Sequence, residues 1–72
     1  DSWITVRGYL DKQIGDEDYL FRDSSGNMKV EIDHKRWHGQ TITPKDQVEL
    51  TGELDKDFNS IELDVKQVRK LP

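Results

Sequence analysis

The sequence contains no cysteine, and none of its apolar runs exceeds three residues. Without cysteine, disulfides, thiolate catalysis and thiolate-bound zinc or iron–sulfur clusters are excluded. Because a membrane-spanning helix needs roughly 20 apolar residues in succession, the sequence offers no such helix. A chain of 72 residues also leaves no room for two independent cores, so we expect one domain over residues 1–72.

Positive charge is scarce relative to negative charge. Eleven Lys and Arg residues stand against 15 Asp and Glu residues, which gives a formal net charge of −4 at pH 7. Sequence-independent binding of nucleic acid depends on basic side chains that release counterions from phosphates. The composition therefore disfavours nucleic acid as a partner.

The pattern that is present is an alternation of apolar and polar residues with period two, which predicts half-buried β-strands. It occurs in five stretches of the chain: 3–10, 19–22, 28–33, 48–54 and 61–65. Turn-forming residues over 23–27 and 55–59 predict two hairpins. The apolar parity slips between Val65 and Val68, which indicates a bulge or a strand end near Gln67.

The order of these elements favours one architecture. Asp33 can cap a short helical turn after the third strand, Gly39 can close it, and Gly8 and Gly52 lie inside strands that must bend. An SH3-like barrel would place its helical turn before the last strand instead. We therefore predict an all-β, five-stranded OB-fold barrel with a short helical connection between strands three and four. Its predicted interior consists of Val6, Leu10, Phe21, Val30, Ile32, Val48, Leu50, Ile61, Leu63 and Val65.

An ordered set of residues spread over nearly the whole chain also carries a family resemblance. The set includes Asp18-x2-Phe21-x-Asp23-x2-Gly26, Val30-x-Ile32-Asp33-His34-Lys35-Arg36-Trp37-x-Gly39 and Gly52-Glu53-Leu54-Asp55-Lys56-Asp57. With it the sequence resembles the bacterial OB-fold (BOF) proteins, small envelope-exported stress proteins of Gram-negative bacteria. The resemblance implies a periplasmic location after removal of a signal peptide. Because the chain begins at Asp1 and not at a methionine, we expect it to be a processed or a trimmed form. The resemblance further implies tolerance of envelope, oxidative or antimicrobial stress, and no nucleic-acid activity.

The outward side chains of the predicted strands divide by charge. Since OB folds usually bind ligands on the face of strands two and three, we predict a ligand-binding set of Arg7, Tyr9, Arg22 and Lys29. Guanidinium groups fork onto phosphate or carboxylate, so this set suits a charged envelope component, such as a lipopolysaccharide or peptidoglycan group, or an outer-membrane protein.

Three alternatives to this predicted site stay open. One is an acidic face that would capture cationic peptides or metal ions; its residues are Glu49, Glu53, Glu62 and Asp64. Another is an oligonucleotide-binding face, for which Tyr9 is thin support because such surfaces stack several bases on aromatic rings. The third is a plain solvated exterior.

Two motifs have the spacing of metal ligands but fit poorly. His34 and His38 lie four residues apart, yet Lys35 and Arg36 repel a cation, and a third ligand would have to be Asp33 or a distant carboxylate. Residues 55–62 resemble the start of a calcium loop, but they lack its glycine at the sixth position and its glutamate at the twelfth. We therefore predict no metal site and no cofactor.

Catalytic motifs are missing as well. None of the serines lies in a Gly-x-Ser-x-Gly context, so no nucleophile can be assigned. The sequence predicts a binding module and not an enzyme. Of the two tryptophans, Trp37 is predicted to plug the bottom of the barrel, whereas Trp3 can either cover the end of the barrel or be exposed.

Overall fold

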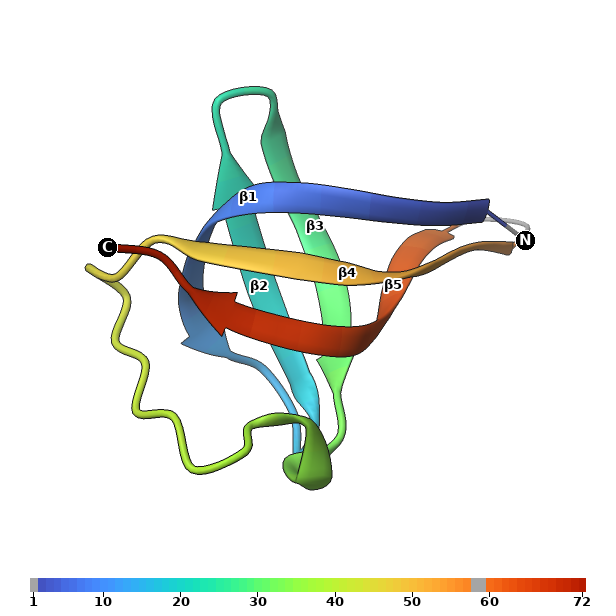
Figure 1. Cartoon of the computed structure of the whole chain (residues 1–72). Helices are drawn as coiled ribbons and strands as arrows, with labels where there is room; N and C mark the ends of the chain where they lie inside the picture. The colour runs from blue at the N-terminus through green and yellow to red at the C-terminus, as the bar shows by residue number, and fades with distance from the viewer. Residues whose placement is uncertain (1, 58–59) are drawn as a thin grey trace.

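Five strands build the molecule in the computed structural model, which describes residues 2–57 and 60–72. They are β1 (Ser2–Gln13), β2 (Asp18–Asp23), β3 (Gly26–Ile32), β4 (Val48–Asp57) and β5 (Ser60–Lys70). The strands close into a barrel in the order β1-β2-β3-β5-β4, in which only β3 and β5 run parallel. In Figure 1, β1, β4 and β5 cross in front of β2 and β3. The predicted five-stranded OB-fold barrel is confirmed.

The connection after β3 is shorter than an α-helix. It is a 3-10 turn, η1 (His34–Arg36), and the Asp33 carboxylate caps it by accepting a hydrogen bond from the Lys35 backbone N–H at 3.0 Å. The chain then turns at His38 and Gly39, both of which have positive φ angles, 51° and 76°. The predicted helical connection is thus confirmed only as a 3-10 turn.

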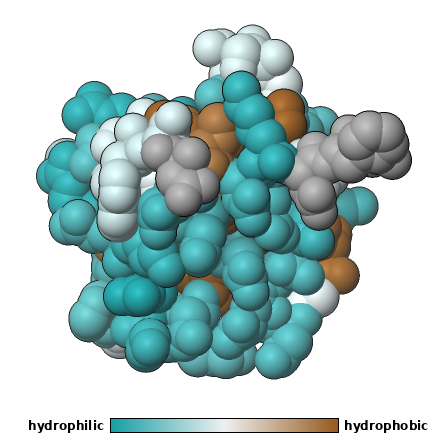
Figure 2. All heavy atoms as spheres, turned by 90° about the vertical axis from the view of Figure 1, so that its right-hand side faces the viewer, coloured by the Kyte–Doolittle hydropathy of each residue, from teal (hydrophilic) through white to brown (hydrophobic). Residues whose placement is uncertain are grey.

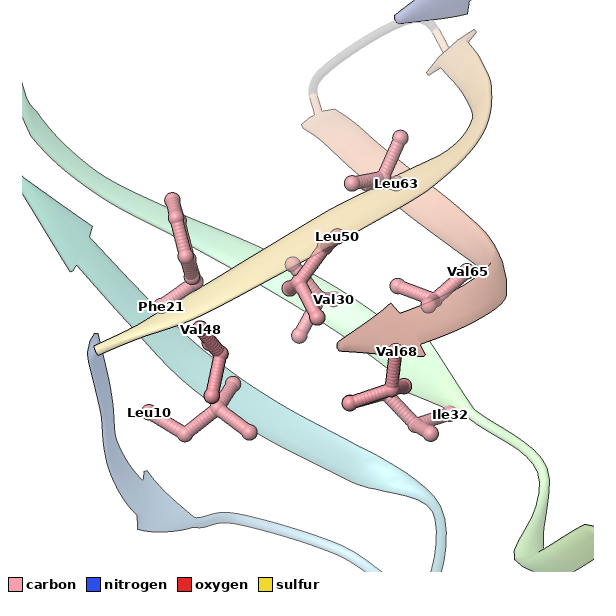
Figure 3. Close-up of a cluster of buried hydrophobic side chains, with 9 residues drawn as sticks. All are labelled: Leu10, Phe21, Val30, Ile32, Val48, Leu50, Leu63, Val65 and Val68. Carbon is pink, nitrogen blue, oxygen red and sulfur yellow. The ribbon is translucent and has the colours of Figure 1, made fainter. Parts of the chain in front are cut away.

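The core lies between the two layers of strands (Figure 3). Its buried members are Leu10, Phe21, Val30, Ile32, Val48, Leu50, Leu63, Val65 and Val68. Two predicted interior residues differ: Val6 is half-buried against this cluster, and Ile61 is 53% exposed because it lies at the open end of the barrel, one residue after β5 begins. Val68, which the prediction left out, is buried.

A bulge in β5 explains the burial of Val68. Opposite β5, Thr51 of β4 faces Gln67 and Gly52 faces Val65, so Lys66 is an extra residue on β5. Because of this extra residue, the Val68 side chain points into the barrel, as that of Val65 does. The bulge that the sequence pattern indicated near Gln67 is thus confirmed. Within the predicted turn over 55–59, residues up to Asp57 continue β4, and the rest lies outside the described residues.

Candidate functional site

Tyr9 and Arg22 face each other on the outer surface of β1 and β2. The guanidinium carbon Cζ of Arg22 lies 4.9 Å from the centroid of the Tyr9 ring, which is within the range of a cation–π interaction. The Nε of Arg22 donates to both carboxylate oxygens of Asp11, at 2.9 and 3.0 Å. Arg22 is therefore positioned by a ring on one side and a carboxylate on the other.

Arg7 lies two residues before Tyr9 in β1, so its side chain projects from the same face of the sheet. Its Nε donates to Oε2 of Glu49 at 2.9 Å. The other oxygen of Glu49 accepts from Nε and Nη2 of Arg69, at 3.2 and 3.0 Å. Glu49 thus bridges two guanidinium groups, and we call Arg7, Tyr9, Arg22 and Arg69 together the arginine surface.

The arginine surface carries more positive than negative charge, because three guanidiniums meet two carboxylates. Hydrogen bonds from Arg69 and Arg7 lower the pKa of Glu49, which keeps this bridge ionised. Arg7 and Arg22 each use only Nε, and their terminal nitrogens donate to no acceptor within the described ranges. Their side chains are 62% and 47% exposed, so these nitrogens are open to a ligand.

Lys29, the fourth residue of the predicted ligand-binding set, lies on the same outer side of the sheet as Arg22 but has acidic partners. Its Nζ is 3.2 Å from Oε2 of Glu62 on β5 and 3.9 Å from Oδ2 of Asp18 on β2. Its pKa is raised, chiefly by the hydrogen bond to Glu62. The structure therefore groups Arg7, Tyr9 and Arg22 with Arg69 and Asp11. Lys29 lies diagonally across from Arg22 on β3, but its ammonium group is paired with acidic residues of β5 and β2.

A row of four carboxylates crosses β2, β3, β5 and β4. The residues of this acidic row, each opposite the next in register, are Asp18, Glu31, Asp64 and Glu53. Burial raises the pKa of Glu31, and the charges of neighbouring carboxylates raise it further. Lys66 is a counterion of the row, with Nζ 3.1 Å from Oδ2 of Asp64.

The acidic row only partly matches the acidic face that the sequence suggested. Glu53 and Asp64 are members, and Glu62 lies two residues before Asp64 on the same side of β5. Glu49, in contrast, lies between Arg7 and Arg69. The predicted cationic and acidic faces are therefore not separate, because ion pairs between neighbouring strands mix positive and negative side chains.

Glu31 and Glu49 give a matched pair of carboxylates for a stability test. The pKa of Glu49 is lowered by folding, so its contribution is present above its ordinary pKa and is lost as the pH falls through its folded pKa. The pKa of Glu31 is raised, so its ionisation opposes folding at neutral pH. At pH 7, we expect Glu49→Gln to lower Tm by about 2–4 °C and Glu31→Gln to raise it slightly.

Calorimetric melting from pH 7 to pH 3 checks this pair. The Tm of each variant should approach that of the unchanged protein as the pH falls, because the carboxyl groups become neutral in the folded and the unfolded state alike. Equal Tm changes of the same sign at pH 7 would contradict the assignment.

The sequence patterns did not predict an open hollow at one end of the barrel. It encloses about 940 Å³ and is lined mainly by apolar side chains at the strand ends, among them Ile4, Met28, Leu54 and Ile61. Figure 2 faces this end, and apolar atoms come to the surface near the top of the view. The sequence indicated only that the apolar residues at the strand ends point inward. It does not show which end of a barrel stays uncovered, so the hollow could not be predicted.

The two tryptophans have different environments. Trp37 packs against the buried core cluster, and its ring meets that of Tyr19 edge to face, with centroids 5.5 Å apart. This agrees with the predicted plug below the barrel. Trp3 is 61% exposed.

Over the described residues, no helix is long and apolar enough to cross a membrane.

Comparison with known protein families identifies the class to which the chain belongs. The family model described as "Bacterial OB fold (BOF) protein" matches residues 1–70, and the chain belongs to this family.

Relatives from three species match nearly the whole chain. Protein YgiW of Escherichia coli K12 is 58% identical over 71 residues, which cover 99% of this chain and 55% of YgiW. The calcium-regulated OB-fold protein CarO of Pseudomonas aeruginosa is 41% identical over 68 residues, with 94% of this chain and 59% of CarO covered. An uncharacterised Haemophilus influenzae protein is 38% identical over 71 residues, 97% of this chain and 59% of its own length. The chain thus spans somewhat more than half of these relatives.

The solved structure of the hypothetical protein YgiW from E. coli superimposes with a TM-score of 0.97 at 58% identity. The match covers 99% of this chain and 76% of that one. The resemblance to the BOF family that the sequence suggested is confirmed.

Proposed function

We propose that the protein is a non-enzymatic binding module that holds an anionic group of a cell-envelope component on its arginine surface. The observation that carries the proposal is that Asp11 and Glu49 fix Arg22 and Arg7 through Nε. Their terminal nitrogens donate to no acceptor in the described part of the chain, and the two side chains are largely exposed. Paired N–H donors of this kind match the oxygens of phosphate and carboxylate.

The net charge of −4 does not oppose binding at this surface. Because the Debye length is about 8 Å at physiological ionic strength, an anion at the arginine surface interacts mainly with the nearest guanidiniums. The Arg22 guanidinium lies over one face of the half-buried Tyr9 ring, so a sugar would stack on the other face. A phosphorylated or carboxylated glycan combines both features.

The proposed location is the periplasm, and the proposed role is tolerance of envelope stress. Both rest on the family resemblance. The absence of a nucleophile in a catalytic context supports a binding role rather than an enzymatic one.

The test replaces the two guanidinium groups by neutral amides. Each charge-assisted contact is worth about 1.5–3 kcal/mol, so we expect the double variant Arg7→Gln/Arg22→Gln to bind a phosphorylated glucosamine disaccharide about 100- to 10,000-fold more weakly. Isothermal titration calorimetry at near-physiological salt measures the loss.

Lys45→Gln is the matched control, because it removes one positive charge from the exposed connection before β4. It should change the affinity less than about twofold, since no side-chain hydrogen bond or ion pair among the described residues joins Lys45 to the arginine surface. Unchanged binding by the double variant, or equal weakening by the control, would refute the arginine surface as the site.

A second candidate is the capture of cationic peptides by the acidic row. The observation that favours it is the raised pKa of Glu31, which reflects burial and carboxylate repulsion that a bound cation would relieve. In this case Glu31→Gln, and not the arginine variants, would weaken binding of a lysine-rich peptide.

A further inference from the structure

Three potential metal ligands meet below the barrel, apart from the arginine surface. They are Asp16 and Glu17, from the connection between β1 and β2, and His34, the first residue of η1. One donor atom from each lies within 4.8 Å of the other two, and His34 Nε2 is 3.7 Å from Oδ1 of Asp16. Zinc binds imidazole nitrogen and carboxylate oxygen at about 2.0–2.2 Å, so the ligands of one ion lie roughly 3–4 Å apart. The three donor atoms therefore lie close to the separations that one ion requires.

The backbone on both sides of this group is fixed by hydrogen bonds. The Ile32 N–H donates to the Glu17 carbonyl at 2.7 Å and ties the connection to the end of β3. The Ile14 N–H donates to the Asp18 carbonyl at 2.8 Å, and the Gln13 side chain donates to the Asp16 carbonyl at 3.1 Å. On the other side, the Asp33 cap holds the turn that begins with His34. The three ligands are therefore brought together by the fold.

We propose that Asp16, Glu17 and His34 form a site for a divalent transition metal ion of the zinc type. The imidazole decides the class of ion, because nitrogen ligands suit zinc, copper and nickel, whereas calcium and magnesium prefer oxygen. Asp16 is 92% exposed and His34 is 65% exposed, so water can fill the remaining coordination positions. The site replaces the two-histidine arrangement considered from the sequence: His38 belongs to no group of three or more ligands within the described ranges.

The test is zinc titration of the whole chain by calorimetry, with NMR chemical shifts as the second readout. We expect one zinc ion to bind with shifts centred on Asp16, Glu17 and His34, and with magnesium and calcium binding far more weakly. His34→Ala should weaken zinc binding at least about tenfold, and Glu17→Gln should weaken it as well. Because His34 is largely exposed, the melting temperature of the metal-free variant should stay unchanged.

His38→Ala is the matched control, since it removes the other histidine of the same connection. It should leave zinc affinity within about twofold, because His38 is outside the group. Zinc binding that His38→Ala abolishes, that Glu31→Gln weakens more than His34→Ala does, or that is absent altogether would overturn the proposal. None of these results depends on the arginine surface, so the two proposals fail separately.

Discussion

Replacing Gly52 with alanine should destabilise the barrel by more than about 3 kcal/mol, which is more than half of its stability. A Cβ at this position would lie 2.1 Å from the Asp64 carbonyl oxygen and 2.9 Å from the Val65 Cα. Both atoms belong to the backbone of β5, next to the bulge, so neither can move without breaking the ladder between β4 and β5. A domain of this size has only about 5 kcal/mol of total stability to lose.

Gly39→Ala serves as the control for Gly52→Ala. Gly39 has a φ of 76° and open space around it, so alanine there meets only the left-handed backbone penalty of about 1–2 kcal/mol. Urea unfolding followed by circular dichroism compares the two variants. A Gly52→Ala protein as stable as Gly39→Ala would show that β4 and β5 do not approach as closely as described.

Leu50→Ala should cost about 2–5 kcal/mol, because it leaves a cavity in the middle of the core. The Leu50 side chain is completely buried, and it lies between the two layers of strands (Figure 3). Ile61→Ala removes a similar aliphatic side chain from the open end of the barrel, where Ile61 is 53% exposed. We expect that variant to lose less than about 1 kcal/mol.

The same urea measurement distinguishes Leu50 from Ile61. Equal losses at the two positions would mean that Ile61 is buried, as its parity in the sequence suggested. If Leu50 is buried and Ile61 is exposed, the two variants should differ clearly in their free energy of unfolding, with the same denaturant slope.

The strands and most of the core follow from the sequence because a period of two places alternate residues on one face. The errors occur where burial depends on what lies across the barrel. Ile61 has the inward parity, but the strand end above it is uncovered. Val68 breaks the parity, and only the bulge at Lys66 shows that it returns to the interior.

The site was harder to predict than the fold, because the partner of each charge is set by barrel closure. Arg7 meets Glu49 because β1 pairs with β4 across 42 positions of sequence. Lys29 meets Glu62 because β3 runs beside β5. Assigning side chains to an outward face needs only parity, whereas predicting ion pairs needs the register between strands that are distant in the sequence.

The most direct test of the arginine surface is an NMR titration of the protein with a phosphorylated glucosamine disaccharide at near-physiological salt. We expect shifts of the Arg7 and Arg22 side-chain Nε signals and of the Tyr9 amide, with the signals of the acidic row unchanged. Shifts confined to Glu31, Glu53 and Asp64 with a lysine-rich peptide, and none at Arg7 or Arg22 with the glycan, would contradict it.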